Sequence, residues 1–326
     1  MKAVLCKEYG PPESLVVEEV PDLEPTGDQV VVSVQAAGVN FPDALIIQGK
    51  YQFKPPMPFA PGGEVSGIVA KVGSSVVGVN EGDRVIALTG WGGFAEQVAI
   101  GADRIVPMPD SMDFPTAAAL MFTYGTSHYA LRDRARLKTG ESLLVLGAAG
   151  GVGLAAVEIG KAIGARVIAA ASSADKLQVC REHGADDLID YKAEDLKERV
   201  KALTGGNGVD VIYDPVGGEY SEPALRTMAW DGRFLVIGFA AGDIPKIPLN
   251  LALLKSCSIV GVFWGAFTAR EPKRNQELIQ ELLGWYAEGT IKPHIYKTYP
   301  LEKAADAIND ITDRKVKGKV VLLPGS

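Results

Sequence analysis

The residues with the clearest chemical meaning form a glycine-rich turn between an apolar run and a helix-like segment. Ser142 to Leu146 is followed at once by Gly147-Ala148-Ala149-Gly150-Gly151-Val152-Gly153. Glycine permits a tight turn and lets backbone amides approach a pyrophosphate. A helix that begins there adds free N–H groups and a partial positive charge for the anion. The turn therefore predicts a dinucleotide site formed by Gly147, Ala149, Gly150, Gly151, Val152 and Gly153. A turn required only for packing is the alternative.

The end of the next predicted strand bears on which dinucleotide binds. An acidic residue about 20 positions beyond the glycine turn would bind the adenosine 2′-hydroxyl of NAD. Here the strand ends in Ser172-Ser173, no carboxylate follows until Asp175, and Lys176 comes next. Hydroxyls and an ammonium suit a 2′-phosphate, so we expect NADPH rather than NADH. Ser172 and Asp175 also fit a helix-capping box, and both interpretations can hold together.

The secondary-structure elements that must position these residues follow two different sequence patterns. From Glu141 onward, apolar strands alternate with amphipathic helices, which predicts an α/β fold with a doubly wound parallel sheet. The strands are expected at 142–147, 166–171, 187–190, 209–214, 233–238 and 258–263, and the helices at 152–163, 174–183, 194–203, 219–229 and 249–255. Short β-branched runs separated by turns occupy the first hundred residues and predict a β-rich domain. We expect this domain to comprise 1–122 and 265–326, and the dinucleotide domain 123–264.

Composition limits the classes of protein to consider. A chain of 326 residues exceeds one comfortable core, so two domains are expected. The net charge of −7 repels phosphate backbones, which disfavours nucleic acid as a partner. Three cysteines and three histidines, all far apart, offer few candidates for a zinc site and no disulfide framework. No signal peptide or membrane span is recognised, so we expect a cytoplasmic protein.

Across its whole length the sequence resembles the medium-chain dehydrogenase/reductases, specifically the zinc-free NADPH:quinone oxidoreductase (zeta-crystallin-like) branch. The matching blocks are Asn40-Phe41-x-Asp43, Pro61-Gly62-x-Glu64-x-x-Gly67, the glycine turn, Asp214-x-Val216-Gly217-Gly218 and Gly318-Lys319-Val320-Val321. The resemblance implies a Rossmann domain and a GroES-like catalytic domain. Glu158 stands where the family fingerprint usually has Gln, a departure that we expect to lie on the surface.

The same resemblance implies that no metal is bound. Asn40 occupies the region of a cysteine ligand in the zinc-dependent alcohol dehydrogenases, and Gly63 replaces the histidine of their Gly-His-Glu motif. Without a metal, polarising an alcoholate is difficult, so alcohol oxidation is disfavoured. The implied reaction is hydride transfer from NADPH to an activated small molecule, either a quinone or an α,β-unsaturated carbonyl.

Further cofactor residues follow from the resemblance. Asn40 and Thr126 are implied on the nicotinamide side, and Lys176 and Tyr191 around the adenosine phosphate. Other residues are expected to contact the cofactor because they lie in a family block, at the carboxyl end of a strand or near a position that contacts the cofactor in the family. They are Gly217, Gly238, Phe239, Ala240, Phe263, Trp264, Gly265 and Arg314. The three aromatic residues among these also suit an ordinary core.

Tyr51 and Asn40 are the candidate catalytic residues. In the related enoyl-thioester reductases the tyrosine that matches Tyr51 is a proposed proton donor, and a phenol is protonated at neutral pH. A rim tyrosine that only shapes the pocket is the alternative. Several quinone reductases carry a second tyrosine where this chain has Leu45. An enoyl-thioester reductase is therefore the alternative enzyme, with Arg270, Lys273 and Arg274 as a basic cluster for coenzyme A phosphates. A nucleotide-binding protein with little turnover also stays open.

The last strand of the predicted parallel sheet suggests the assembly. Ser258 to Phe263 is apolar and would lie at the sheet edge. An uncovered edge can pair with a second copy, so we expect a homodimer.

Overall fold

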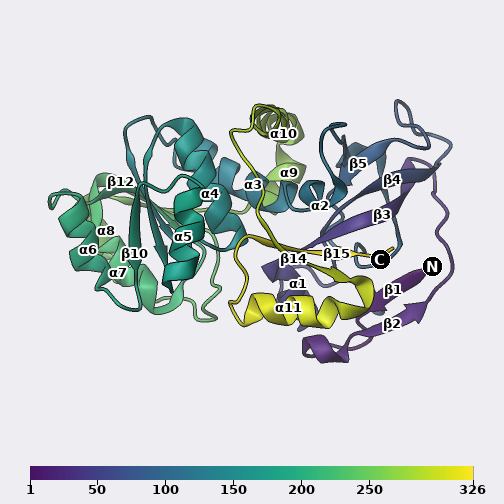
Figure 1. Cartoon of the computed structure of the whole chain (residues 1–326), viewed down its shortest axis with the longest axis horizontal. Helices are drawn as coiled ribbons and strands as arrows, with labels where there is room; N and C mark the ends of the chain where they lie inside the picture. The colour runs from purple at the N-terminus through teal and green to yellow at the C-terminus, as the bar shows by residue number, and fades with distance from the viewer. Residues whose placement is uncertain (326) are drawn as a thin grey trace. The chain divides into compact units, whose positions relative to one another are not determined.

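The computed structural model describes residues 1–325, which form two compact units. The first unit comprises Met1–Phe122 and the chain from Pro293 onward, and the second comprises Thr123–Lys292 (Figure 1). The sequence placed the return to the first domain at residue 265, but residues 265–292 belong to the second unit. The reason is tertiary packing: the indole of Trp264 is bonded to Asn275, and Glu281 is bound by His128. These contacts hold α9 (Trp264–Arg270) and α10 (Pro272–Ala287) to that unit.

The second unit contains a six-stranded parallel sheet whose order is β10-β9-β8-β11-β12-β13. If these six strands are numbered 1 to 6 in the order in which they occur along the chain, their order in the sheet is 3-2-1-4-5-6. This is the order of a doubly wound sheet and confirms the predicted α/β fold class. The strands are β8 (Ser142–Leu146), β9 (Arg166–Ala171), β10 (Asp187–Asp190), β11 (Val209–Asp214), β12 (Met228–Val236) and β13 (Ser258–Gly261). The helices between them are α4 (Gly151–Ile163), α5 (Ala174–Glu182), α6 (Leu196–Leu203), α7 (Ser221–Leu225) and α8 (Asn250–Lys255), and α3 (Met121–His128) precedes them.

One helix of this unit is much shorter than its sequence predicts. A helix was expected over 219–229, but α7 ends at Leu225 and β12 begins at Met228. Met228 already pairs with Val209 at the start of β11, with a register irregularity before Val211. Sheet pairing therefore ends the helical segment early, because it satisfies backbone groups that a longer helix would have used.

The first unit is β-rich. Its larger sheet has the order β14-β15-β3-β4-β5-β7, and β6 pairs with β3. The strands are β3 (Gln29–Val39), β4 (Glu64–Val72), β5 (Arg84–Ala87), β6 (Gln97–Gly101), β7 (Ile105–Pro107), β14 (Ile295–Pro300) and β15 (Lys319–Leu323), accompanied by α1 (Phe41–Ile46), α2 (Phe114–Ala117) and α11 (Ala304–Thr312). Buried side chains of β3, β4 and β15, such as Val32, Val65 and Val320, share one apolar core. The unit therefore joins the first third of the chain to its last strands.

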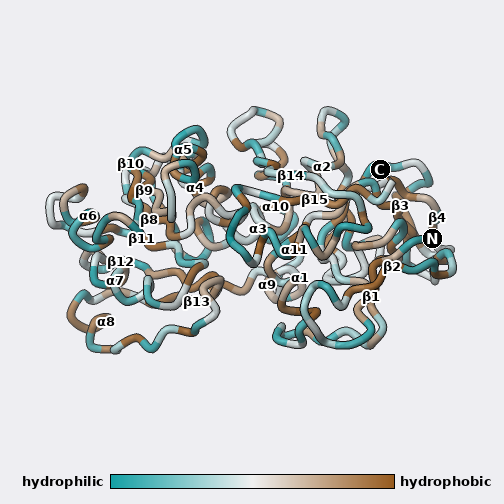
Figure 2. The backbone as a smooth tube through the Cα atoms, turned by 60° about the horizontal axis from the view of Figure 1, so that its bottom comes forward, coloured by the Kyte–Doolittle hydropathy of each residue, from teal (hydrophilic) through white to brown (hydrophobic). Residues whose placement is uncertain are grey.

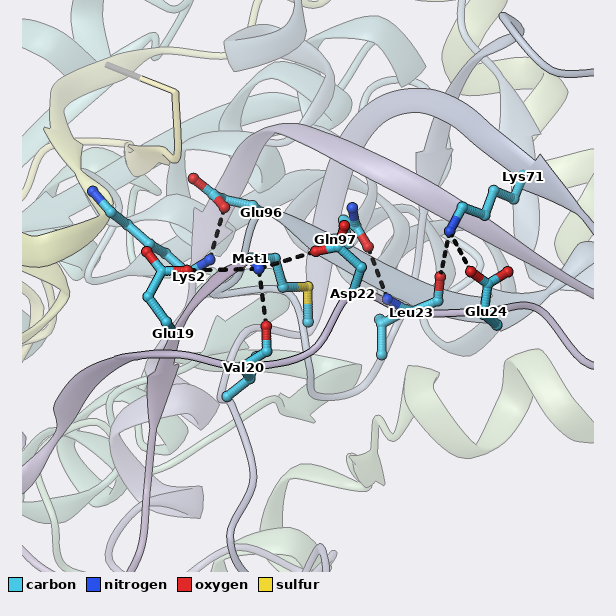
Figure 3. Close-up of polar contacts among 10 residues, drawn as sticks. All are labelled: Met1, Lys2, Glu19, Val20, Asp22, Leu23, Glu24, Lys71, Glu96 and Gln97. Carbon is cyan, nitrogen blue, oxygen red and sulfur yellow. Dashed lines mark hydrogen bonds and ion pairs between the residues drawn. The ribbon is translucent and has the colours of Figure 1, made fainter.

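The first residues are fastened to this unit by polar contacts (Figure 3). β1 (Lys2–Leu5) pairs antiparallel with β2 (Val16–Glu19). The ammonium group of Met1 donates to the carbonyl oxygen of Val20 at 2.9 Å and to the Asp22 carboxylate at 3.0 Å. The backbone N–H of Lys2 donates to the Glu96 carboxylate at 2.7 Å. The last of these bonds satisfies a backbone N–H of β1, and the Met1 bonds hold the residue that precedes the strand.

Candidate functional site

The glycine turn joins β8 to α4 with the geometry that an anion site requires. The N-cap of α4 is Gly150, whose carbonyl oxygen accepts the Leu154 N–H at 2.8 Å as the first hydrogen bond of the helix. Helix geometry therefore leaves the preceding amides, those of Gly151 to Gly153, without an intrahelical acceptor. Gly147 has φ of +57°, and a Cβ on Gly153 would lie 2.3 Å from the Gly147 carbonyl oxygen. Packing thus requires glycine at 153, and the free amides remain available to a pyrophosphate.

The residues expected around the adenosine phosphate lie close together. The Lys176 ammonium is 3.3 Å from the Ser172 hydroxyl at the end of β9. The Tyr191 N–H donates to the Ala171 carbonyl at 3.1 Å, which brings the end of β10 beside the end of β9. The predicted capping box is wrong, because the N-cap of α5 is Ser173, whose hydroxyl donates to Asp175. Ser172 and Lys176 are therefore not committed to a helix cap.

The ends of β11 and β12 form an adjoining turn that Asp214 organises. One carboxylate oxygen of Asp214 accepts the N–H groups of Val216 and Gly217 at 2.8 and 2.9 Å, and the other accepts the Ser221 hydroxyl at 2.6 Å. Burial raises the pKa of Asp214 above its usual range. The Ala240 N–H donates to the Pro215 carbonyl at 3.0 Å. The structure thus brings together the predicted residues Gly217, Gly238, Phe239 and Ala240.

The aromatic pair after β13 divides into an exposed and a buried member. Phe263 is 47% exposed, whereas Trp264 is 4% exposed. A Cβ on Gly125 would lie 2.4 Å from the Trp264 indole, so this glycine allows the indole to pack on α3 beside Thr126. The structure thus supports the packing alternative for Trp264. Cofactor contacts by Thr126, Phe263 and Gly265 stay predictions.

In the first unit, three neighbouring strand ends converge on a buried polar cluster of Asn40, Glu64 and Lys319. The Lys319 ammonium lies 2.5 Å from the Asn40 amide oxygen and 3.2 Å from a Glu64 carboxylate oxygen. The same Glu64 oxygen accepts the Asn40 amide nitrogen at 3.3 Å, and the other accepts the Phe122 N–H at 2.7 Å. All three side chains are buried. Hence Asn40, a predicted site residue, is held by two charged partners.

Asp43 is bonded beside this cluster and acts electrostatically on Tyr51. Its carboxylate accepts the Asn40 N–H at 2.7 Å and the Gly62 N–H at 3.1 Å. Burial raises the pKa of Asp43 to about 6, against the opposing effect of these N–H groups and of Lys319. Tyr51 is half-buried after α1, and its pKa is raised by burial and by the Asp43 charge. Its phenol is therefore protonated at neutral pH.

The side chains in this cluster do not fit a zinc ion. Neither an asparagine at 40 nor a glycine at 63 supplies the thiolate or imidazole that zinc prefers. Within residues 1–325, no group of three or more His, Cys, Asp or Glu side chains converges to hold a metal. The Glu64 carboxylate is already paired with a cation, because the Lys319 ammonium contacts it directly.

Sequence reasoning missed the polar cluster and misplaced Glu158. The Pro61-Gly62-x-Glu64 and Gly318-Lys319 blocks were visible, but nothing in their spacing showed that they meet. Glu158 is buried, not on the surface, where its carboxylate accepts the Tyr124 hydroxyl at 2.6 Å and the Lys292 N–H at 3.0 Å and contacts His183 at 2.5 Å. Arg314, with φ of +59°, lies in the first unit just after α11, and its cofactor contact stays a prediction.

Comparison with known proteins agrees with this architecture. Residues 26–110 match the family model described as the alcohol dehydrogenase GroES-like domain, and residues 151–284 match that described as zinc-binding dehydrogenase. Quinone oxidoreductase-like protein 2 homolog from Nematostella vectensis is 42% identical over 98% of this chain and 88% of its own. The chain belongs to the quinone oxidoreductase branch of the medium-chain dehydrogenase/reductases. Asn40 and Gly63 lie in the part that matches the GroES-like model, not the part that matches the zinc-binding model.

Solved structures extend the agreement over nearly the whole chain. Escherichia coli quinone oxidoreductase complexed with NADPH is 33% identical, with a TM-score of 0.92 over 99% of this chain and all of that one. The CurK enoyl reductase is 27% identical, with a TM-score of 0.88 over 99% of this chain and 98% of that one. This chain is thus a quinone oxidoreductase-like oxidoreductase. No helix within residues 1–325 is long and apolar enough to cross a membrane.

Proposed function

We propose that the protein is a zinc-independent, NADPH-dependent reductase that delivers hydride to a quinone or an α,β-unsaturated carbonyl. The observation that carries this proposal is that Asn40, which the family resemblance places in the region of a zinc-ligating cysteine, is bonded instead to the Lys319 ammonium beside Glu64. An amide and an ammonium cannot activate an alcohol by coordination. The acceptor must then be electrophilic on its own, as quinones and enones are.

NADPH binding is supported by the donors at the strand ends of the second unit. Bound NADPH would supply a hydride, that is, two electrons and one proton equivalent. The amides at the start of α4 suit its pyrophosphate, and Ser172, Lys176 and Tyr191 suit the adenosine 2′-phosphate. The relative from Escherichia coli described above was crystallised with NADPH. Preference for NADPH over NADH rests on the Lys176–Ser172 pair and the missing acidic residue.

Reduction also requires a proton, and Tyr51 is the proposed donor. Hydride addition to the β-carbon of an enone leaves an enolate, whose carbon or oxygen must be protonated. The raised pKa of Tyr51 keeps its phenol protonated before transfer. A reduced quinone is much less basic than an enolate, so water can protonate it. Tyr51 therefore matters mainly for enone substrates.

An enoyl-thioester reductase is the second candidate, supported by Tyr51, by Leu45 and by the similarity to the CurK enoyl reductase. The proposed basic cluster for coenzyme A weighs against it. Arg274 is already bonded to Asp133 at 2.8 Å and to Glu277 at 3.0 Å. A phosphate would have to displace these carboxylates from Arg274, which removes one of the three proposed phosphate contacts and favours the quinone or enone assignment.

The proposal is tested by NADPH oxidation with a benzoquinone, a naphthoquinone, a short enone and crotonyl-CoA, each before and after prolonged chelation. We expect turnover of a quinone or the short enone that chelation leaves unchanged. Preferred turnover of crotonyl-CoA would establish the second candidate. Activity lost on chelation and restored by zinc would refute the zinc-independent mechanism, and no turnover of any acceptor would favour a non-catalytic nucleotide-binding protein.

We further propose a homodimer formed along β13. This strand is the edge of the parallel sheet, and Ile259 in it is 40% exposed. Leu253 and Leu254 of the neighbouring α8 are 77% and 66% exposed, and Figure 2 shows hydrophobic chain near the α8 and β13 labels. Pairing with a second β13 would satisfy its free backbone groups and cover these side chains. A cytoplasmic location stays a prediction from the sequence.

A further inference from the structure

The hydrogen-bond capacity of Asn40 is almost fully used inside the protein. A side-chain amide has two N–H donors and two acceptor lone pairs on its oxygen. The nitrogen of Asn40 is 3.3 Å from both the Gly38 carbonyl and Glu64, and its oxygen accepts the Lys319 ammonium at 2.5 Å. Only one lone pair of the amide oxygen is uncommitted. In this orientation Asn40 can accept a hydrogen bond from a bound molecule but cannot donate one.

The opposite orientation of the amide is unfavourable on both sides. Rotating it by half a turn would place its N–H groups against the Lys319 ammonium and its oxygen against the Glu64 carboxylate. Two donors would then face each other, and so would two acceptors, in a buried setting where unpaired polar groups are costly. Lys319 is itself fixed, because its three N–H groups have acceptors in Asn40, Glu64 and the Val39 carbonyl.

We propose that Lys319 is a positioning residue that, together with Glu64, holds Asn40 as an obligate hydrogen-bond acceptor for the bound cofactor. This rests on the proposed function in one respect, the assignment of Asn40 to the nicotinamide side. The ligand group that meets Asn40 must then be an O–H or N–H donor. The ribose hydroxyls and the carboxamide N–H groups of NADPH are donors of this kind.

The test separates orientation from simple charge pairing. Lys319→Met alone leaves Glu64 buried without its cation, so we expect a lower Tm. The double variant Lys319→Met/Glu64→Gln removes both charges, and we expect it to regain most of the lost Tm. The amide of Asn40 is then free to rotate, and we expect NADPH affinity, measured by fluorescence titration, to be about fivefold weaker, the scale of one hydrogen bond between neutral groups. If the ion pair only stabilised the fold, the double variant would regain both the Tm and the NADPH affinity of the parent protein.

A thermodynamic cycle identifies the route of the effect. If Lys319 acts through Asn40, the loss of affinity in Asn40→Leu and the loss in Lys319→Met/Glu64→Gln will overlap when the changes are combined. The matched control is Arg233→Met/Glu141→Gln, which removes an ion pair with a 2.6 Å contact inside the second unit. We expect this control to bind NADPH within about twofold of the parent protein, since Glu141 and Arg233 lie toward the amino ends of the parallel strands, away from the glycine turn at their carboxyl ends.

Two results would overturn the proposal: parent-like NADPH affinity in the folded Lys319→Met/Glu64→Gln variant, or fully additive losses in the cycle. If that variant does not fold, Lys319→Gln/Glu64→Gln replaces it, because neutral amides at 319 and 64 can bond to either orientation of Asn40. Parent-like NADPH affinity in this variant would then be decisive against the proposal. The affinity measurement needs no turnover, so absence of activity in the parent protein would count against the proposed function only.

Discussion

Replacing Lys176 by alanine tests the basis of cofactor choice. The Lys176 ammonium lies 3.3 Å from the Ser172 hydroxyl at the end of β9, where an acidic residue would select NAD. Removing it deletes one hydrogen bond between charged groups, worth about 1.5–3 kcal/mol. This corresponds to a loss of NADPH affinity of about tenfold to a hundredfold. Ser172 and Tyr191 remain in place, so the turn itself should be unchanged.

The assay is a pair of fluorescence titrations, with NADPH and with NADH, at two salt concentrations. We expect Lys176→Ala to weaken NADPH binding on this scale and to leave NADH affinity nearly unchanged, because NADH has no 2′-phosphate. The loss should shrink at high salt, since screening already weakens the contact in the parent protein. The control is Lys201→Ala, which removes an equal charge from α6 in the same unit. Equal affinity of the parent protein for both cofactors, or equal losses of both in Lys176→Ala, would refute the assignment.

Three other expectations concern the proton donor, the assembly and pH. Tyr51→Phe should lower kcat toward an enone about 10²–10⁴-fold and should change kcat toward a quinone and NADPH affinity little. Steady-state kinetics with both acceptors measure this, and an equal fall of kcat toward the enone and the quinone would exclude a donor role. Ile259→Lys should convert a dimer to monomers in light scattering, whereas the same change at Val77, which is 92% exposed in the first unit, should not. Asp43 has a pKa raised to about 6, so it binds a proton more tightly when folded than when unfolded. Its contribution to the free energy of unfolding therefore falls by about 2 kcal/mol as pH rises from about 4 to 7. In urea unfolding across that range, Asp43→Asn should lack this fall, and parallel curves for the two proteins would contradict the raised pKa.

Local sequence patterns were informative where one strand, turn and helix carry the signal. The glycine turn lies between β8 and α4, and Ser172 and Lys176 meet at the end of β9, because neighbours in sequence determine both. The strands at 166–171, 187–190 and 209–214 have the predicted bounds, since their apolar runs are bounded by turns. Here local propensity and the buried sheet favour the same structure.

Residues that meet only in three dimensions could not be found in this way. Lys319 is separated by more than 250 positions from Glu64, and no periodicity links β15 to the start of β4. The domain boundary was misplaced for a similar reason, because the pattern of α10 resembles an ordinary amphipathic helix and does not reveal which unit it packs against. Glu158 looked like a surface substitution because its partners, Tyr124 and Lys292, come from other parts of the chain.

The position of Glu158 has a consequence for the modular construction of the protein. One oxygen of its carboxylate accepts the hydroxyl of Tyr124, at the beginning of the second unit, and the N–H of Lys292, at its end. The two ends of this unit are thus tied to a single atom, and the unit forms one continuous insert within the chain of the other. A domain with adjoining ends can be transplanted between hosts or produced separately with little strain at the junctions. Cut sites for such chimaeras lie just before α3, which begins at Met121, and just after Lys292, so that Glu158 and both of its partners travel together.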